Sequence, residues 1–417
     1  MFKICTLFFV PLFAIIMSMN SLAASAVSKA PLSYNLDFKM ELIPQQEGAQ
    51  VNITIDKGQL MEQMRFDNPH GIYSNIKATG KLTFKDDVVI WDLPSEKAQL
   101  SYFVKIPHER SPGKFDAMMT KDWAIFRGDD LFPAVNTKEA DGAYSVATLT
   151  VVLPEGWKSI ETGWPRKKGT TFSIDNPSRL FDRPTGWMIA GNIGTRRTRV
   201  AKTSIAVSAP KSEHFQRMDA LTFLNFVWPE MHDAFKSTPK KLLVVGGGDP
   251  MWRGGLSASN SLFLHADRPL VSENGTSPLL HELTHMVTRI SGTVVNGKND
   301  DWIAEGIAEF YSFELLYRAK GMTKSRRNGV IASLASWGAD VKSLRATKSS
   351  GPVTARAVVL LDELDKEIRK RSYDKYCLDD VVRELMPKRK VSLHDLSMAS
   401  EKLVKGKLKA LESPLLK

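Results

Sequence analysis

A short segment beginning at Ser277 holds the residues whose types and spacing point most directly to chemistry. It reads SPLLHELTHMVTRISG, which places His281 and His285 four residues apart with Glu282 beside the first of them. Residues at this spacing share one face of an α-helix, so the two imidazoles can bind one Zn²⁺. The glutamate of an H-E-x-x-H pattern can act as a general base that activates water. The segment therefore predicts a hydrolytic metal site.

The flanking residues favour a helix here. Ser277 is a good N-cap, Pro278 suits the first helical position, and Gly292 can end the helix. Apolar residues fall on the face opposite the two histidines: Leu279, Leu280, Leu283, Met286, Val287 and Ile290. The alternative is a surface helix with two solvated histidines, and a second segment of the chain argues against it.

That second segment is residues 301–320, a predicted helix with Asp300 or Asp301 at its start and Gly321 at its end. It is apolar nearly all round, so we expect it to be buried. Glu305 and Glu309 nevertheless share one of its faces. A buried carboxylate without a partner costs several kcal/mol, and Zn²⁺ would supply that partner to Glu305. Glu309 would then accept the free N–H of a ligating histidine. A salt bridge to a basic residue is the alternative.

The predicted site is therefore one Zn²⁺ per chain, held by His281, His285 and Glu305, with Glu282 as the catalytic base. Three protein ligands leave a position open, as in catalytic zinc sites. We expect no other cluster of His or Cys residues to compete for the metal.

The HELTH sequence followed by DWIAEGIAEFY resembles the gluzincin (thermolysin-like) zinc metallopeptidases, whose third ligand is the Glu of a W-x-x-E-G segment. Within this group the chain is most similar to the glycyl aminopeptidase family. The resemblance covers residues 240–385 and, in general layout, the β-rich part before them. It implies an N-terminal β domain, a thermolysin-like catalytic domain and peptidase activity. The PDZ domain of that family is expected to be missing, because the chain ends soon after the catalytic region.

Two further departures concern substrate binding. The family's G-G-L-E-H stretch, whose Glu is placed for the substrate's amino terminus, corresponds to GGLSA here, so Ser257 replaces the Glu. Glu273 and Asp249 are the alternatives for that role. The family's oxyanion-stabilising Tyr corresponds to residues 353–354, which are Val and Thr. Its substitutes could be Arg356, Tyr373 or Tyr376, among which the sequence does not decide.

The rest of the chain predicts a multidomain α+β protein. We expect a signal peptide at 1–26, an antiparallel β-sandwich-like domain at 30–209, and a mainly helical, thermolysin-like gluzincin catalytic domain at 213–405. Within 214–236, a predicted helix, Pro229 is expected to interrupt the helix. The expected strands are residues 34–42, 51–55, 80–84, 88–93, 100–106, 144–153, 199–207, 242–245 and 261–265.

Composition limits the class of protein. The chain has 417 residues, 43 % hydrophobic and 25 % charged, as in soluble globular proteins. Its net charge of +11 comes from scattered basic residues without interleaved aromatics, so we expect no nucleic-acid partner. Cys5 would leave with the signal peptide, and Cys377 then has no disulfide partner. No later run is apolar enough to cross a membrane, which predicts a periplasmic or secreted protein.

These features together predict an exported zinc-dependent peptidase that acts on peptides or proteins. The alternative from another class is a non-catalytic zinc-containing binding or scaffold protein derived from such a peptidase. The presence of Glu282 argues against it, because a structural zinc site needs no base. The sequence predicts neither the substrate nor the oligomeric state.

Overall fold

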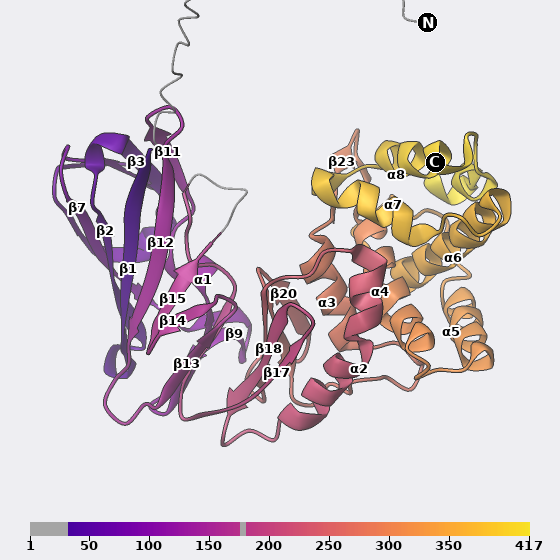
Figure 1. The fold of residues 1–417 in the computed structure, drawn as a ribbon, viewed down its shortest axis with the longest axis horizontal. Coiled ribbons are helices and arrows are strands. Elements are labelled where there is room, and N and C mark those ends of the chain that lie inside the picture. The colour runs from indigo at the N-terminus through magenta and orange to yellow at the C-terminus, as the bar shows by residue number, and fades with distance from the viewer. Residues whose placement is uncertain (1–31, 176–180) are drawn as a thin grey trace, which may run out of the picture.

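The computed structural model describes residues 32–175 and 181–417. The predicted signal peptide, residues 1–26, lies outside the described residues. Figure 1 shows strands of the N-terminal half on one side, helices of the C-terminal half on the other, and a sheet containing β17, β18 and β20 between them. The predicted α+β class is confirmed, with eight α-helices and several sheets among the described residues.

The N-terminal half is built from three sheets. The largest has the order β14 (Arg166–Lys168), β15 (Thr171–Ile174), β12 (Tyr144–Val152), β1 (Ser33–Ile43), β2 (Gly48–Ile55), β7 (Ala98–Lys105) and β4 (Tyr73–Ala78). A second has the order β13 (Ser159–Thr162), β16 (Trp187–Gly191), β10 (Trp123–Arg127), β9 (Lys114–Met119) and β8 (His108–Ser111). The third has the order β11 (Val135–Glu139), β3 (Met61–Asp67), β6 (Val88–Asp92) and β5 (Lys81–Lys85). Strand β1 alternates buried and exposed residues, as its sequence predicts.

One expectation about this region is wrong. The largest sheet is not purely antiparallel, because β1 pairs with β12 in parallel, with Phe38 opposite Leu149. Alternation of apolar and polar residues reports which face of a strand is buried and is the same for both strand directions, so it could not reveal this pairing.

A five-stranded sheet joins the two halves. Its order is β17 (Ile193–Val200), β18 (Thr203–Pro210), β19 (Lys241–Gly247), β21 (Ser261–His265) and β20 (Gly255–Ala258). The strand expected at 199–207 is in fact a hairpin that turns at Ala201, whose φ is +51°. The division of the chain at residue 209 stays a prediction, and the hairpin before it belongs to the sheet that follows.

The three middle strands of this central sheet, β18, β19 and β21, are buried on both faces. Leu243 and Val245 of β19 pack with Trp187 and Phe263 toward the second sheet, and the Trp187 and Phe263 ring centres lie 5.2 Å apart. Leu242 and Val244, which alternate with these residues along β19, face the helices. A buried ionic cluster also links the halves, because Glu161 of β13 pairs with Lys241 of β19 at 3.2 Å.

The helices follow in the C-terminal half. They are α2 (Arg217–Phe235), α3 (Pro278–Thr288), α4 (Asp301–Arg318), α5 (Lys324–Trp337), α6 (Pro352–Ser372), α7 (Leu378–Leu385) and α8 (Leu393–Val404), with α1 (Gly128–Leu131) in the N-terminal half. Two short strand pairs lie between these helices. Strand β22 (Ser291–Gly292) pairs with β25 (Lys390–Val391), and β23 (Val294–Val295) pairs with β24 (Lys298–Asn299).

Helix α2 does not break at Pro229, contrary to expectation. Its neighbours Trp228 and Met231 are buried in the core, and this packing offsets the loss of one backbone hydrogen bond. Within the described residues, we find no helix whose length and apolar character suit a membrane crossing.

Candidate metal centre

Helix α3 begins as the sequence predicts. The Ser277 side chain accepts a hydrogen bond from the Leu280 backbone N–H at 3.2 Å, and Pro278 occupies the first turn. The helix ends earlier than predicted, at Thr288, because Arg289 adopts a left-handed conformation with φ of +53°. Gly292 instead belongs to β22 and pairs with β25. Both histidines of the segment nevertheless lie within the helix.

The structure brings His281, His285 and Glu305 together. Their imidazole Nε2 atoms lie 3.1 Å apart, and each is 3.5 Å from one carboxylate oxygen of Glu305. Tetrahedral ligands bound at about 2.0–2.1 Å from zinc stand roughly 3.3 Å from one another. Two imidazoles and one carboxylate are also a donor set that catalytic zinc favours. The three side chains therefore fit a zinc ion without rearrangement.

Glu309 lies where the sequence predicts it. One of its carboxylate oxygens is 2.8 Å from Nδ1 of His281. When the proton is on Nδ1, this N–H donates a hydrogen bond to Glu309. The Nε2 lone pair then faces Glu305 and is available to a metal. Glu309 therefore holds the tautomer and the ring orientation that metal binding requires.

The position of Glu305 is set by close packing of α4 against α6. A Cβ atom at Gly306 would lie 3.0 Å from that of Ala357, so the two helices approach closely beside Glu305. At the start of α4, the Asp300 side chain makes no capping hydrogen bond. It is fully buried and pairs with Arg345 at 2.6 Å, which ties the first turn of α4 to the loop before α6.

The carboxylates around the histidines favour positive charge at this point. Burial opposes protonation of His281, but its hydrogen bonds to Glu305 and Glu309 outweigh burial and raise its pKa to about 10. Burial likewise opposes ionisation of Glu305, and the two histidines hold its pKa well below its usual range. A proton and a metal cation satisfy the same electrostatic demand, so they compete for this site.

Glu282 faces strand β20. A Cβ atom at Gly255 would lie 2.6 Å from Cγ of Glu282, so the strand passes directly beside this carboxylate. Strand β20 is at the end of its sheet and pairs only with β21 among the described strands. Its other edge presents backbone N–H and C=O groups to which an extended peptide can add.

Side chains alternate along β20, and this places Ser257. Leu256 and Ala258 pack toward the core that contains Trp187. Gly255 and Ser257 therefore face the opposite side, toward α3 and Glu282. The Ser257 hydroxyl is thus on the side of the strand that faces the predicted site.

The structure narrows the alternatives for an amine-binding carboxylate. Asp249 is bound by Arg253 and by Lys114, the latter at 2.8 Å, and these two cations hold its pKa well below its usual range. It is therefore already neutralised. Glu273 is exposed in the loop before α3, and the described hydrogen bond at this residue joins its backbone carbonyl to Arg326.

One of the three candidates for oxyanion stabilisation is excluded. Tyr373 ends α6 and is 94 % exposed. Sixteen residues of helix, about 24 Å, separate Tyr373 from Ala357, which packs beside Glu305. Arg356 is in the half of α6 nearest the site. Thr354 is buried and bonds Ser349 through its hydroxyl at 2.9 Å.

Sequence analysis missed a second group with ligand chemistry. Asp249, His265 and Asp267 place potential donor atoms within 4.8 Å of one another. The expectation of no rival cluster of His or Cys residues is not contradicted, because this group contains one His, two Asp and no Cys. Nδ1 of His265 accepts the Asp267 backbone N–H at 3.1 Å, so Nε2 carries the proton and offers no lone pair. Together with the neutralised Asp249, this makes the group a poor metal site. Asp249 lies 16 residues before His265, so no short spacing pattern indicates this group in the sequence.

Many solved structures have a similar architecture, including the following two. One is an aminopeptidase N family protein from Idiomarina loihiensis, with a TM-score of 0.62, 15 % identity, and coverage of 85 % of this chain and 70 % of that one. The other is a mutant of an M1 zinc metallopeptidase from Deinococcus radiodurans, with a TM-score of 0.57, 14 % identity and 92 % of each chain covered. The chain has the fold of these zinc metallopeptidases. No family model matches the sequence, and no curated protein is detectably similar to it.

Proposed function

We propose that the protein is an exported zinc-dependent peptidase whose C-terminal half acts as a gluzincin catalytic domain. One observation carries the proposal: the donor atoms of His281, His285 and Glu305 converge at zinc-ligand spacing, with Glu282 beside the free edge of β20. The metal group and the substrate-binding edge are needed together for peptide hydrolysis, and they lie together here. The fold likeness to two metallopeptidases supports the same function.

His281, His285 and Glu305 would hold the zinc ion. When bound, zinc supplies a Lewis acid that polarises a carbonyl group and lowers the pKa of water to about 7. Glu309 keeps His281 in the tautomer that can bind the metal.

Glu282 has the role of general acid and base. Its carboxylate takes the proton of the attacking water and then delivers it to the amine that leaves. Backbone groups on the outer edge of β20 bind the peptide in an extended conformation and hold the scissile bond beside Glu282. Arg356 and Tyr376 are the remaining candidates to stabilise the oxyanion.

We further propose that the cleft prefers internal bonds to free amino termini. Ser257 carries no charge that could pair with a substrate ammonium, and Asp249 already pairs with two cations. Cleavage away from the N-terminus requires no such carboxylate.

The proposal is tested by incubating the purified mature protein with a generic peptide library. We expect cleavage that a chelator abolishes and added zinc restores. Glu282→Gln keeps the size of the side chain and removes the base, so we expect hydrolysis to fall at least ~10²-fold while zinc remains bound. The matched control is Glu155→Gln, an exposed glutamate of the N-terminal half.

Binding of zinc without any cleavage by the parent protein would contradict the peptidase proposal and would instead indicate a non-catalytic zinc protein. Equal activity of Glu282→Gln and the parent would show that Glu282 is not the base.

A further inference from the structure

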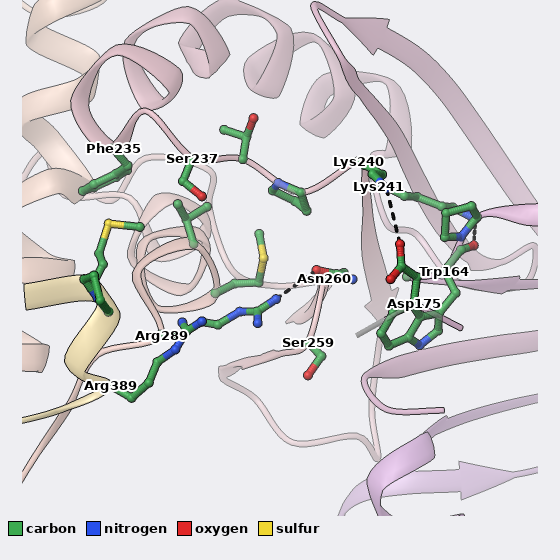
Figure 2. A pocket seen from close by; sticks show the side chains of 18 of the residues that line it. Trp164, Asp175, Phe235, Ser237, Lys240, Lys241, Ser259, Asn260, Arg289 and Arg389 are labelled. Atoms are coloured by element: carbon green, nitrogen blue, oxygen red, sulfur yellow. Dashed lines mark hydrogen bonds and ion pairs between the residues drawn. The ribbon is translucent and has the colours of Figure 1, made fainter. Parts of the chain in front are cut away.

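A cavity of about 860 Å³ lies between the end of α3, the turn from β20 to β21 and the segment after α7 (Figure 2). Trp164, Phe235, Met286 and Met386 contribute apolar walls. Its volume is in the range of ligand-binding pockets in proteins. It contains none of the three residues of the metal group.

The polar lining of this cavity is strongly basic. Asp175 is the only acidic lining residue in the described part of the chain. Five lining residues are cationic and come from the start of β19, the end of α3 and the segment from α7 to β25: Lys240, Lys241, Arg289, Arg383 and Arg389.

Three of these cations have carboxylate partners: Lys240 with Asp175 at 3.3 Å, Lys241 with Glu161 at 3.2 Å, and Arg383 with Asp380 at 2.6 Å. Arg389 differs, because no carboxylate of the described residues lies within 4.0 Å of its guanidinium. Figure 2 shows it on the same side of the cavity as Arg289, which donates to the side-chain oxygen of Asn260 at 3.3 Å. The charge of Arg389 is therefore available to an anionic ligand.

A guanidinium is well suited to such a ligand, because it binds a carboxylate through two parallel hydrogen bonds. The C-terminal end of α3 also borders the cavity, and its partial negative charge disfavours an anion there. An anion must consequently be held by the arginine side chains rather than by the helix end.

The two elements that flank Glu282, helix α3 and the hairpin of β20, also border the cavity at their far ends. Helix α3 passes from Glu282 to Arg289 over seven residues, about 10 Å. Strand β20 passes Glu282 at Gly255 and leads to Ser259 and Asn260, which line the cavity. An extended peptide advances about 3.3 Å per residue, so it would reach the cavity about three residues from the bond beside Glu282.

We infer that this cavity is a specificity subsite for acidic peptides, in which Arg389 and Arg289 bind an aspartate or glutamate side chain about three residues from the cleaved bond. The inference rests on the proposed peptidase function for the meaning of the cleaved bond. The binding of an acidic peptide by Arg389 does not depend on turnover and can be measured separately.

The binding test uses two probes, acetylated tetraglutamate amide and the matched tetraglutamine amide, with the Glu282→Gln variant to prevent cleavage. We expect tetraglutamate to bind about tenfold more tightly or better, as for one or more charge-assisted hydrogen bonds. Adding Arg389→Gln should remove most of this preference. Adding Lys390→Gln is the control, because Lys390 is the adjacent exposed cation and does not line the cavity. Equal affinity for the two probes, or an equal loss in both variants, would overturn the inference.

The cleavage test distinguishes the inference from the function on which it rests. A substrate found in the library is varied by placing one glutamate two, three or four residues from the cleaved bond, on either side. The control peptides carry glutamine at the same positions. We expect kcat/KM to rise for glutamate at one position near three, and Arg389→Gln to abolish that rise. Cleavage without any preference for glutamate would overturn the subsite and leave the peptidase intact. The protein could also prefer tetraglutamate through Arg389 and yet cleave no peptide. That result would support the anion site and contradict the proposed peptidase function.

Discussion

At the scale of single residues, the site combines groups that satisfy each other's charge and hydrogen bonds. Glu309 orients His281, and Glu305 faces both imidazoles. Ser257 carries an uncharged hydroxyl on β20, the strand that passes beside Glu282. We propose that this residue affects where a substrate is cut rather than whether metal binds.

The first prediction concerns Ser257. A substrate ammonium gains no carboxylate partner from Ser257, and leaving it unpaired in a partly desolvated cleft costs about 1–3 kcal/mol. We therefore expect a peptide with an acetylated N-terminus to be cleaved at least as well as the same peptide with a free amine. The measurement compares kcat/KM for the two. A strong preference for the free amine would contradict this prediction and would indicate aminopeptidase activity.

At the scale of elements, the groove depends on how closely β20 approaches α3. Gly255 permits this approach, since any Cβ atom there meets Glu282. Gly306 similarly permits the approach of α6 to α4 beside Glu305. Neither contact is visible in the local sequence, because each joins segments that are distant along the chain.

The second prediction is that Gly255→Val reduces peptide turnover while zinc binding is retained. The larger side chain must displace Glu282 or the strand, and a shift of about 1 Å in a catalytic group costs about 10²-fold in rate. The control is Gly329→Ala in α5, where an added Cβ meets nothing within 4 Å. Undiminished turnover of Gly255→Val would show that β20 does not border the reacting bond.

Much of the candidate site could be predicted because its signals are local. The H-E-x-x-H spacing and the capping of α3 by Ser277 depend on neighbouring residues, and Glu305 and Glu309 show their shared face within one helix. What was missed depends on tertiary contacts. The parallel pairing of β1 with β12, the unbroken helix at Pro229 and the cavity around Arg389 all arise from packing between distant segments. Tyr373 remained a candidate only until the length of α6 placed it far from Glu305.

At the scale of the whole molecule, the central sheet and a buried ionic cluster join the two halves. The Glu161 side chain is 1 % exposed and lies against Lys241, Arg166 and Arg197. Burial opposes ionisation of Glu161, but these cations hold its pKa below its usual range. Its ionised form therefore stabilises the folded chain.

The third prediction is that Glu161→Gln lowers the free energy of unfolding by about 3–5 kcal/mol, because Lys241 is left buried without its counter-charge. The control is Glu62→Gln, which removes an exposed ion pair with Lys138 and should change the stability little, because water screens the two charges. Thermal unfolding of the three proteins provides the comparison.

The pH dependence of that difference follows from the depressed pKa. The stabilisation is fully present above the unfolded-state pKa of glutamate, about 4.3, and is lost as the pH falls through the lower folded-state value. The melting temperatures of parent and Glu161→Gln should therefore converge at acidic pH. A difference that is absent at neutral pH would contradict the role of the cluster.

The central claim is that His281, His285 and Glu305 bind a zinc ion. Its most direct test is the zinc content of the purified mature protein and of His281→Ala, measured after removal of loosely bound metal. We predict one zinc per chain in the parent protein and near-complete loss in the variant, since one of three protein ligands is gone. Full retention of zinc by His281→Ala would contradict the assignment of the site.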